Sequence, residues 1–211
     1  MTATTHSLNT RASSSWVGDY FGTLAGALAA AEATGRDGRA LSIDDAVLWA
    51  ADTARHVHDK GNKLMFVGNG GSAAIASHMA TDYSKNGNLR ALSMSDGSML
   101  TCLGNDYGYE HVFAKQIEFH ARPGDLLIAI SSSGKSANIL NAVAAARQHG
   151  CTVLTLSGFE PGNPLRSQGD MNLFLRATYY GFVEIGHLAL CHAVLDFAME
   201  RDGRGAAGMK S

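Results

Sequence analysis

The sequence has 211 residues, 45% of them hydrophobic, and a formal net charge of −2. These values are typical of one soluble globular domain with an ample core, and they argue against a disordered chain or a strongly basic nucleic-acid-binding protein. The three cysteines, Cys102, Cys151 and Cys191, are widely spaced and form no CxxC motif, so buried reduced thiols are the simplest interpretation.

The two ends of the chain predict its boundaries. Residues 1–13 are polar and lack the apolar core of a signal peptide, and the apolar runs elsewhere are shorter than the roughly 18 residues that a membrane helix needs. We therefore expect a single domain over 14–201 between a mobile tail (1–13) and a frayed end (202–211). The expected location is cytoplasmic, with no membrane and no nucleic acid as partner.

Two helices are predicted before the first strand. Residues 14–33 have helical composition and precede a break at 35–38, and a second helix begins after the N-cap Ser42 and ends near residue 60. The first helix carries apolar side chains that could pack within one subunit or against another subunit. They include Trp16, Phe21 and Leu24.

From residue 63 the chain alternates between strands and helices. Strands are predicted at 63–67, 90–94, 126–130, 152–156 and 171–175, and helices at 72–84, 98–103, 110–121, 136–149 and 183–200. The run at 126–130 is apolar throughout, as expected of a strand that is buried on both faces. This alternation predicts a doubly wound parallel sheet in a three-layer α/β/α sandwich, with the N-terminal helices added to it.

Two loops rich in glycine or serine each follow a predicted strand and precede a predicted helix. They are Gly68-Asn69-Gly70-Gly71-Ser72 and Ser131-Ser132-Ser133-Gly134-Lys135-Ser136. Free amides at a helix start, together with serine hydroxyls, can bind a phosphate group. Because ligands of such sheets collect at the carboxyl ends of strands, both loops predict a phosphorylated small molecule as ligand. ATP is less expected, because Ala129 stands where a P-loop has its first glycine.

Acidic and histidine side chains on two predicted helices are candidates for a metal or acid–base site. His78 and Asp82 are four residues apart and share one helix face, which suits two ligands of one divalent cation, although a surface His–Asp pair is the alternative. The last helix is otherwise apolar but carries Glu184, His187 and His192, and burying such groups is costly unless they are paired or bound. Spacing alone favours His187 as the partner of Glu184, since Glu184 and His192 lie about 12 Å apart along the axis.

Four blocks of the sequence, in this order, resemble the SIS (sugar isomerase) domain. They are GNGGSAAIASH (68–78), LGNDYGYEHVFAKQIE (103–118), GDLLIAISSSGKSANILNAV (124–143) and EIGHLALCH (184–192). The resemblance covers about residues 20 to 200 and is greatest to the phosphoheptose isomerases, which interconvert D-sedoheptulose 7-phosphate and D-glycero-D-manno-heptose 7-phosphate. It implies the SIS fold, a metal-assisted enediolate mechanism, one Zn²⁺ per subunit, and a cytoplasmic homotetramer with active sites at subunit contacts.

The resemblance also implies the site residues. Its phosphate and substrate contacts fall on Asn69, Gly70, Gly71, Ser72, Asn105, Asp106, Ser131, Ser132, Ser133 and Ser136, and its metal ligands on His78, Asp82, Glu184 and His192. It thus selects His192 over His187. Asp82 and His192 are the expected acid–base pair, with Glu184 as a further catalytic carboxylate.

Three positions depart from the family pattern. Family members usually have glutamate in place of Asp82, glutamine in place of Glu184 and a polar residue in place of Gly181. These departures leave open which carboxylate is the base and which phosphosugar is the substrate. The alternatives are an isomerase of another phosphosugar, or a non-catalytic SIS protein that binds a phosphosugar or a protein partner. A binding protein has no need of Glu184 and His192 on a buried helix, which favours an enzyme.

Overall fold

The computed structural model describes residues 15–205, so the tail predicted at 1–13 lies outside the described residues, as does 206–211. Seven strands form one sheet in the order β2-β1-β7-β6-β5-β3-β4. The strands are β1 (Glu32–Gly35), β2 (Ala40–Leu41), β3 (Leu64–Gly68), β4 (Ala91–Ser93), β5 (Leu126–Ser131), β6 (Thr152–Gly158) and β7 (Met171–Leu175). Strands β3 to β7 are parallel, whereas β1 is antiparallel to both of its neighbours.

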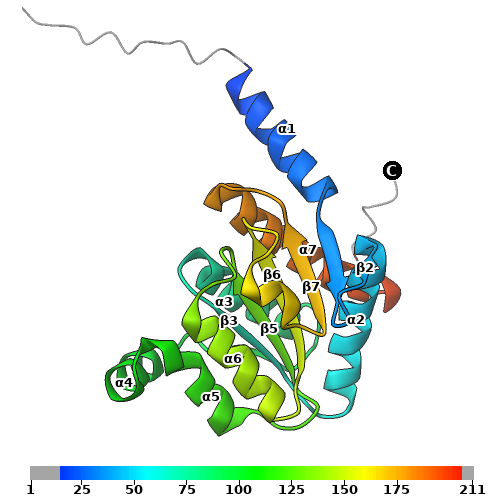
Figure 1. The fold of residues 1–211 in the computed structure, drawn as a ribbon. Helices are drawn as coiled ribbons and strands as arrows, with labels where there is room; N and C mark the ends of the chain where they lie inside the picture. The colour runs from blue at the N-terminus through cyan, green and yellow to red at the C-terminus, as the bar shows by residue number, and fades with distance from the viewer. Residues whose placement is uncertain (1–14, 206–211) are drawn as a thin grey trace, which may run out of the picture.

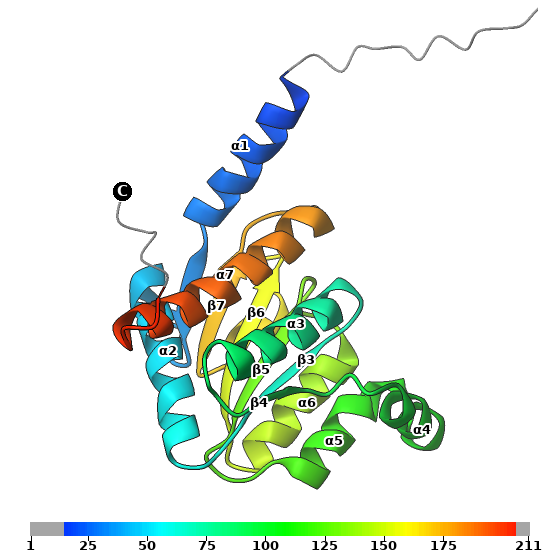
Figure 2. The ribbon, with the colours of Figure 1, turned by 180° about the vertical axis from the view of Figure 1, so that it is seen from behind.

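Helices cover both faces of this sheet (Figures 1 and 2). One face carries α2 (Ile43–Asp59), α3 (Gly71–Lys85) and α7 (Tyr180–Arg201), and the other carries α5 (Val112–His120) and α6 (Ala137–Gln148). The helix α4 (Gly97–Tyr107) lies beside α5, and α1 (Trp16–Ala29) projects away from the sheet. Short 3₁₀ turns occupy Tyr109–His111 and Pro164–Ser167. The predicted three-layer, doubly wound fold is confirmed.

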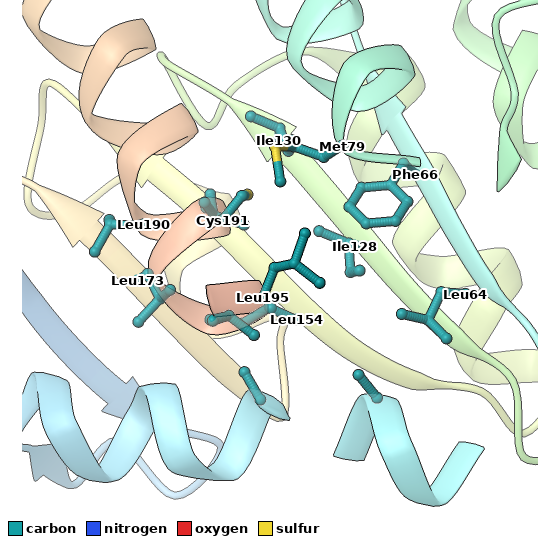
Figure 3. Packing of buried hydrophobic residues seen from close by; sticks show 14 of the residues in the cluster. Leu64, Phe66, Met79, Ile128, Ile130, Leu154, Leu173, Leu190, Cys191 and Leu195 are labelled. Atoms are coloured by element: carbon teal, nitrogen blue, oxygen red, sulfur yellow. The ribbon is translucent and has the colours of Figure 1, made fainter. Parts of the chain in front are cut away.

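The continuous apolar strands supply the core on both faces. In β3, Leu64 and Phe66 point into the cluster under α2, α3 and α7, and Met65 and Val67 point into the cluster under α5 and α6. Figure 3 shows the first cluster, in which Phe66 lies near Met79 of α3. All residues of β3 and β5 are buried, as a parallel sheet covered on both faces requires.

The segment after α1 does not follow the sequence expectation. The helix predicted to residue 33 ends at Ala29, and the chain then forms the hairpin of β1 and β2. Because β1 pairs with β7 and buries Ala33, sheet pairing outweighs the helical propensity of this alanine-rich stretch. The N-cap prediction is confirmed, since the Ser42 hydroxyl accepts a hydrogen bond from the Asp45 amide at 3.0 Å.

The last helix also differs from expectation. At 22 residues, α7 is long and apolar enough to span a membrane by length and composition alone, although no such stretch was predicted. In the fold α7 packs against α2 and α3, with Val183, Leu190 and Val194 buried. These contacts make it a core helix of the domain.

The strand order places the two predicted loops side by side. Strand β3 lies between β4 and β5, so the connection from β3 runs to β4 on one side, and the next connection, from β4, runs to β5 on the other side of β3. This reversal is a topological switch point, where the carboxyl ends of the strands open a crevice. The loops that follow β3 and β5 therefore meet at one edge of the sheet.

Candidate active site

A cavity of about 230 Å³ lies at the carboxyl ends of β3 and β5. Both predicted loops contribute to it, and so does the first part of α7. Its lining residues are Asn69, Gly70, Gly71, Ser72, Ile130, Ser131, Ser132, Ser133, Ser136, Tyr180 and Glu184. The structure thus brings together the residues of both loops that the sequence nominated for phosphate.

Two helix N-termini open into this cavity. No side chain caps α3 at Gly70, and the amides of Gly71 and Ser72 donate no hydrogen bond among the described residues. The first turn of α6 follows Ser136, whose side chain likewise accepts no capping hydrogen bond. Free N–H groups and the positive ends of two helix dipoles therefore face the cavity, a combination that favours an anion.

The serine loop is held in shape by its own hydroxyls and by a neighbouring asparagine. The Gly134 amide donates to the Ser131 carbonyl at 3.1 Å and hydroxyl at 3.2 Å. Gly134 has a φ of +62°, and the buried side chain of Asn163 leaves no room for a Cβ there. Only glycine satisfies both conditions. The loop is therefore preorganised around the cavity.

The Asn69 side chain is occupied within the protein. Its amide exchanges two hydrogen bonds of 2.9 Å with the Asn138 amide, and its Oδ1 also accepts from the Tyr109 hydroxyl at 3.2 Å. Asn69 therefore fixes the path of the glycine loop. Neither Asn138 nor Tyr109 was predicted, because nothing local in the sequence marks contacts with residues 69 and 40 positions away.

A second group of polar side chains joins α3 to α7. One nitrogen or carboxylate oxygen from each of His78, Asp82 and His192 lies within 4.8 Å of the others. The His78 Nε2 is 3.5 Å from the Asp82 Oδ2, and the rings of His78 and His192 are 5.4 Å apart between centroids. Two imidazoles and one carboxylate that converge in this way fit the donor set of a catalytic zinc site with an open position.

His187 and Glu184 lie apart from this group. His187 is fully buried, and its Nε2 lies 3.1 Å from the Ser157 carbonyl. Burial lowers the pKa of His187 from 6.5 to about 4, against the opposing effect of the Ser157 hydrogen bond. Helix spacing alone favoured His187, but His192 is the histidine of α7 that lies beside His78. Glu184 lines the cavity at the carboxyl ends of β3 and β5 and is absent from the three-residue group.

Two predicted substrate contacts lie on α4, away from the lining of the cavity. The Asn105 Nδ2 donates to the neighbouring Asp106 Oδ1 at 2.8 Å, and both side chains are exposed. Tyr180, in contrast, lines the cavity but was not predicted, because α7 begins at Tyr180 rather than at residue 183.

Comparisons with known proteins agree with this geometry. A family model described as the SIS domain matches residues 36–158. The phosphoheptose isomerase of Pelobacter propionicus is 41% identical over 143 residues, which are 65% of this chain and 75% of that protein. That of Geobacter sp. strain M21 is 36% identical over 167 residues, or 76% of this chain and 84% of that protein.

A solved structure extends the likeness to nearly the whole fold. The phosphoheptose isomerase GmhA from Neisseria gonorrhoeae matches with a TM-score of 0.75 and 31% identity. The match covers 86% of this chain and 97% of that chain. The fold, the two loops at the switch point and these likenesses together lead to one conclusion: the chain belongs to the SIS domain family and, within it, to the phosphoheptose isomerases, which are aldose–ketose isomerases.

Proposed function

We propose that the protein interconverts D-sedoheptulose 7-phosphate and D-glycero-D-manno-heptose 7-phosphate. One observation carries the proposal: a single helix, α3, has its free N-terminus in the serine-lined cavity and carries His78 and Asp82 further along. Gly71 and His78 are seven residues apart, or about 10 Å along the axis. This spacing suits a substrate whose phosphate and reacting carbons lie at opposite ends.

The serine loop binds the phosphate in this proposal. Ser131, Ser132, Ser133 and Ser136 offer hydroxyl groups, and the first turns of α3 and α6 offer amides. Hydrogen bonds to a charged phosphate are stronger than those between neutral groups. The phosphate itself undergoes no covalent change. The binding energy gained at the phosphate end positions the reacting carbons at the other end of the substrate.

Asp82 and His192 act as the acid–base pair. The base removes the proton from the carbon beside the carbonyl, and the proton is returned to the neighbouring carbon while a hydroxyl proton moves between the two oxygens. No atom or electron is gained or lost in this exchange. Asp82 has two carboxylate oxygens and His192 has two ring nitrogens, so one atom of each side chain can bind a metal ion while the other contacts the substrate.

His78, Asp82 and His192 would hold a divalent cation, which we propose is Zn²⁺. When bound, it supplies Lewis-acid polarisation of the carbonyl and hydroxyl oxygens of the substrate and stabilises negative charge that develops there. Metal analysis of the purified protein tests this assignment. About one zinc per subunit is expected, and the His78→Ala variant is expected to lose it; equal zinc in both proteins would refute the site.

We further propose a cytoplasmic homotetramer with active sites at subunit contacts. The helix α1 has no buried residue, and Trp16 and Phe21 are 61% and 60% exposed in the single chain. Large apolar side chains gathered on one projecting helix are typical of an interface. Light scattering should show a tetramer, and Phe21→Glu should give smaller species; a monomeric wild-type protein would contradict the proposal.

A panel of heptose, hexose and pentose phosphates tests the substrate. Conversion of sedoheptulose 7-phosphate with the highest kcat/KM supports the proposal. A second candidate is an isomerase of another phosphosugar, favoured by Gly181, which stands where family members have a polar side chain and where a Cβ would lie only 3.2 Å from the Tyr20 hydroxyl. Preference for another sugar would select that candidate, and no conversion of any sugar would indicate a binding protein.

A further inference from the structure

An aromatic side chain that was not predicted from the sequence forms part of the cavity lining. Tyr180 is the first residue of α7, and it lines the cavity together with Glu184, one helical turn further on. Tyr180 and His192 are 12 residues apart, or about 18 Å along the axis of α7. Tyr180 therefore lies at the serine-loop end of the site, remote from the proposed acid–base pair.

The Tyr180 ring contacts a second aromatic ring, which does not itself line the cavity. Its centroid is 4.9 Å from that of Phe159, and the two ring planes are 84° apart, which is an edge-to-face contact. Phe159 follows the last residue of β6 and packs against the core cluster under α2, α3 and α7. Phe159 thus connects Tyr180 to the end of a buried strand.

The backbone of Phe159 has an unfavourable conformation. Its φ is +56°, and within residues 15–205 the only other residue besides glycine with a positive φ is Asn88. Asparagine tolerates this region because of its short polar side chain, but a bulky side chain such as phenylalanine is strained there. Strain of this kind persists only where the surrounding structure imposes it, and it clusters at ligand sites. The strain at Phe159 therefore points to a function for the contact that its ring makes.

The cavity offers an anion only neutral hydrogen-bond donors. Across the described part of the chain its lining contains no lysine or arginine, and its donors are chiefly serine hydroxyls and the backbone amides at the start of α3. Hydrogen bonds from such donors are stronger where water is excluded, because the effective dielectric constant is lower there. An aromatic ring at the edge of the cavity supplies apolar surface that excludes water.

We propose that Tyr180 is a further substrate-binding residue whose ring covers the phosphate group, and that Phe159 is a positioning residue that keeps this ring in place. Tyr180 contacts the phosphate end of the substrate and shields its hydrogen bonds from water. Phe159 acts only through Tyr180. This inference rests on the proposed function and adds an aromatic wall to its phosphate site.

Calorimetry with inorganic phosphate and the full-length protein tests the wall, and KM and kcat for the sugar phosphate are a second readout. Tyr180→Ala should weaken phosphate binding about tenfold, because the hydrogen bonds to phosphate become exposed to water. The loss with the sugar phosphate should appear in KM rather than in kcat. Tyr180→Phe keeps the ring and should bind phosphate much more tightly than Tyr180→Ala. Unchanged binding in Tyr180→Ala, or equal losses in the two variants, would overturn the inference.

Glycine at position 159 tests the positioning role. Phe159→Gly removes the ring and adopts the positive φ without strain, and it should weaken phosphate binding about fivefold. Asn88→Gly is the matched control: it places glycine at the other positive φ, at an exposed position outside the cavity lining, and should leave binding unchanged. In a Tyr180→Ala background, Phe159→Gly should have no further effect, because it acts through the Tyr180 ring. Additive losses, or unchanged binding in Phe159→Gly, would overturn the positioning role.

These outcomes separate the inference from the proposed function. A wild-type protein that binds phosphate, loses affinity in Tyr180→Ala and converts no sugar phosphate would support the aromatic wall and refute the isomerase. Conversion of the sugar phosphate with the same KM in the wild type and Tyr180→Ala would support the isomerase and refute the wall. If the wild type binds no phosphate, the serine-loop site fails, and the inference fails with it.

Discussion

The polar groups at the two ends of the parallel sheet differ in whether they have hydrogen-bond partners within the protein. At the amino end, the buried carboxylate of Asp125 accepts four hydrogen bonds, from the Asn62 side chain, the Lys63 amide and ammonium and the Arg122 amide. At the carboxyl end, the amides of Gly71 and Ser72 and the carboxylate of Glu184 have no hydrogen-bond partner within the described residues. A satisfied polar cluster contributes to stability, whereas an unsatisfied one leaves capacity for a ligand.

The pKa values follow the same division. Burial by itself would raise the pKa of Asp125, but the hydrogen bonds from Lys63, Asn62 and Arg122 outweigh it and lower the pKa of this carboxyl. The amino end therefore keeps its charge pair over the usual pH range. Nearer the carboxyl end, His187 stays neutral because burial lowers its pKa. The comparison predicts that substitutions at one end change activity and that substitutions at the other change stability.

The largest effect is expected at the carboxyl end. His192→Ala should lower kcat by roughly 10²–10⁴-fold, since it removes one member of the proposed acid–base pair. The unfolding midpoint should change little, because His192 belongs to a partly exposed group. Steady-state kinetics and thermal unfolding measure both quantities. Near-normal turnover would refute the role of His192.

At the amino end, Asp125→Ala should lower the free energy of unfolding by about 3 kcal/mol, because it leaves the half-buried Lys63 ammonium without its partner. The kcat of the folded protein should remain close to that of the wild type. Urea unfolding measures the change. Asp52→Ala is the matched control: it breaks an exposed pair with Arg201 and should cost less than about 1 kcal/mol. Equal losses in the two variants would contradict the assigned role of burial.

The third prediction concerns pH. Because the pKa of His187 is about 4 in the folded protein and 6.5 in its ordinary environment, the unfolded chain binds a proton first as the pH falls. The contribution of the neutral, buried His187 to the free energy of unfolding is complete above pH 6.5 and is lost progressively towards pH 4. Between pH 7 and 5 the free energy of unfolding of the wild type should fall by on the order of 2 kcal/mol more than that of His187→Gln. Identical pH slopes for the two proteins would show that His187 does not titrate in this way.

The smallest effect is expected from a single hydroxyl of the serine loop, which we propose binds the phosphate. Ser136→Ala should raise the KM for the sugar phosphate about tenfold and leave kcat nearly unchanged, because it removes one hydrogen bond to a charged group remote from the reacting carbons. Ser167→Ala, on an exposed 3₁₀ turn, is the control and should leave KM unchanged. A fall in kcat with constant KM would place Ser136 near the chemistry instead.

Much of the fold could be predicted from local pattern. The run at 126–130 is apolar throughout and becomes β5, and Ser42 with Asp45 begins α2 as its composition indicates. The hairpin of β1 and β2 could not be predicted in this way, because its alanine-rich sequence favours a helix and only pairing with β7 makes it a strand. The start of α7 was also predicted too late, at residue 183, whereas the helix begins at Tyr180, which lines the cavity.

Local sequence pattern was enough to predict the chemical groups available to this protein: two loops suited to a phosphate group, and histidines and carboxylates on two helices. Composition and spacing carry that information because they act over a few neighbouring residues. Which of these groups lie close together depends on the packing of the folded chain. It set His192 rather than His187 beside His78, and it brought Glu184 to Gly71, because the rotation of α7 about its axis depends on packing against α2, α3 and the sheet.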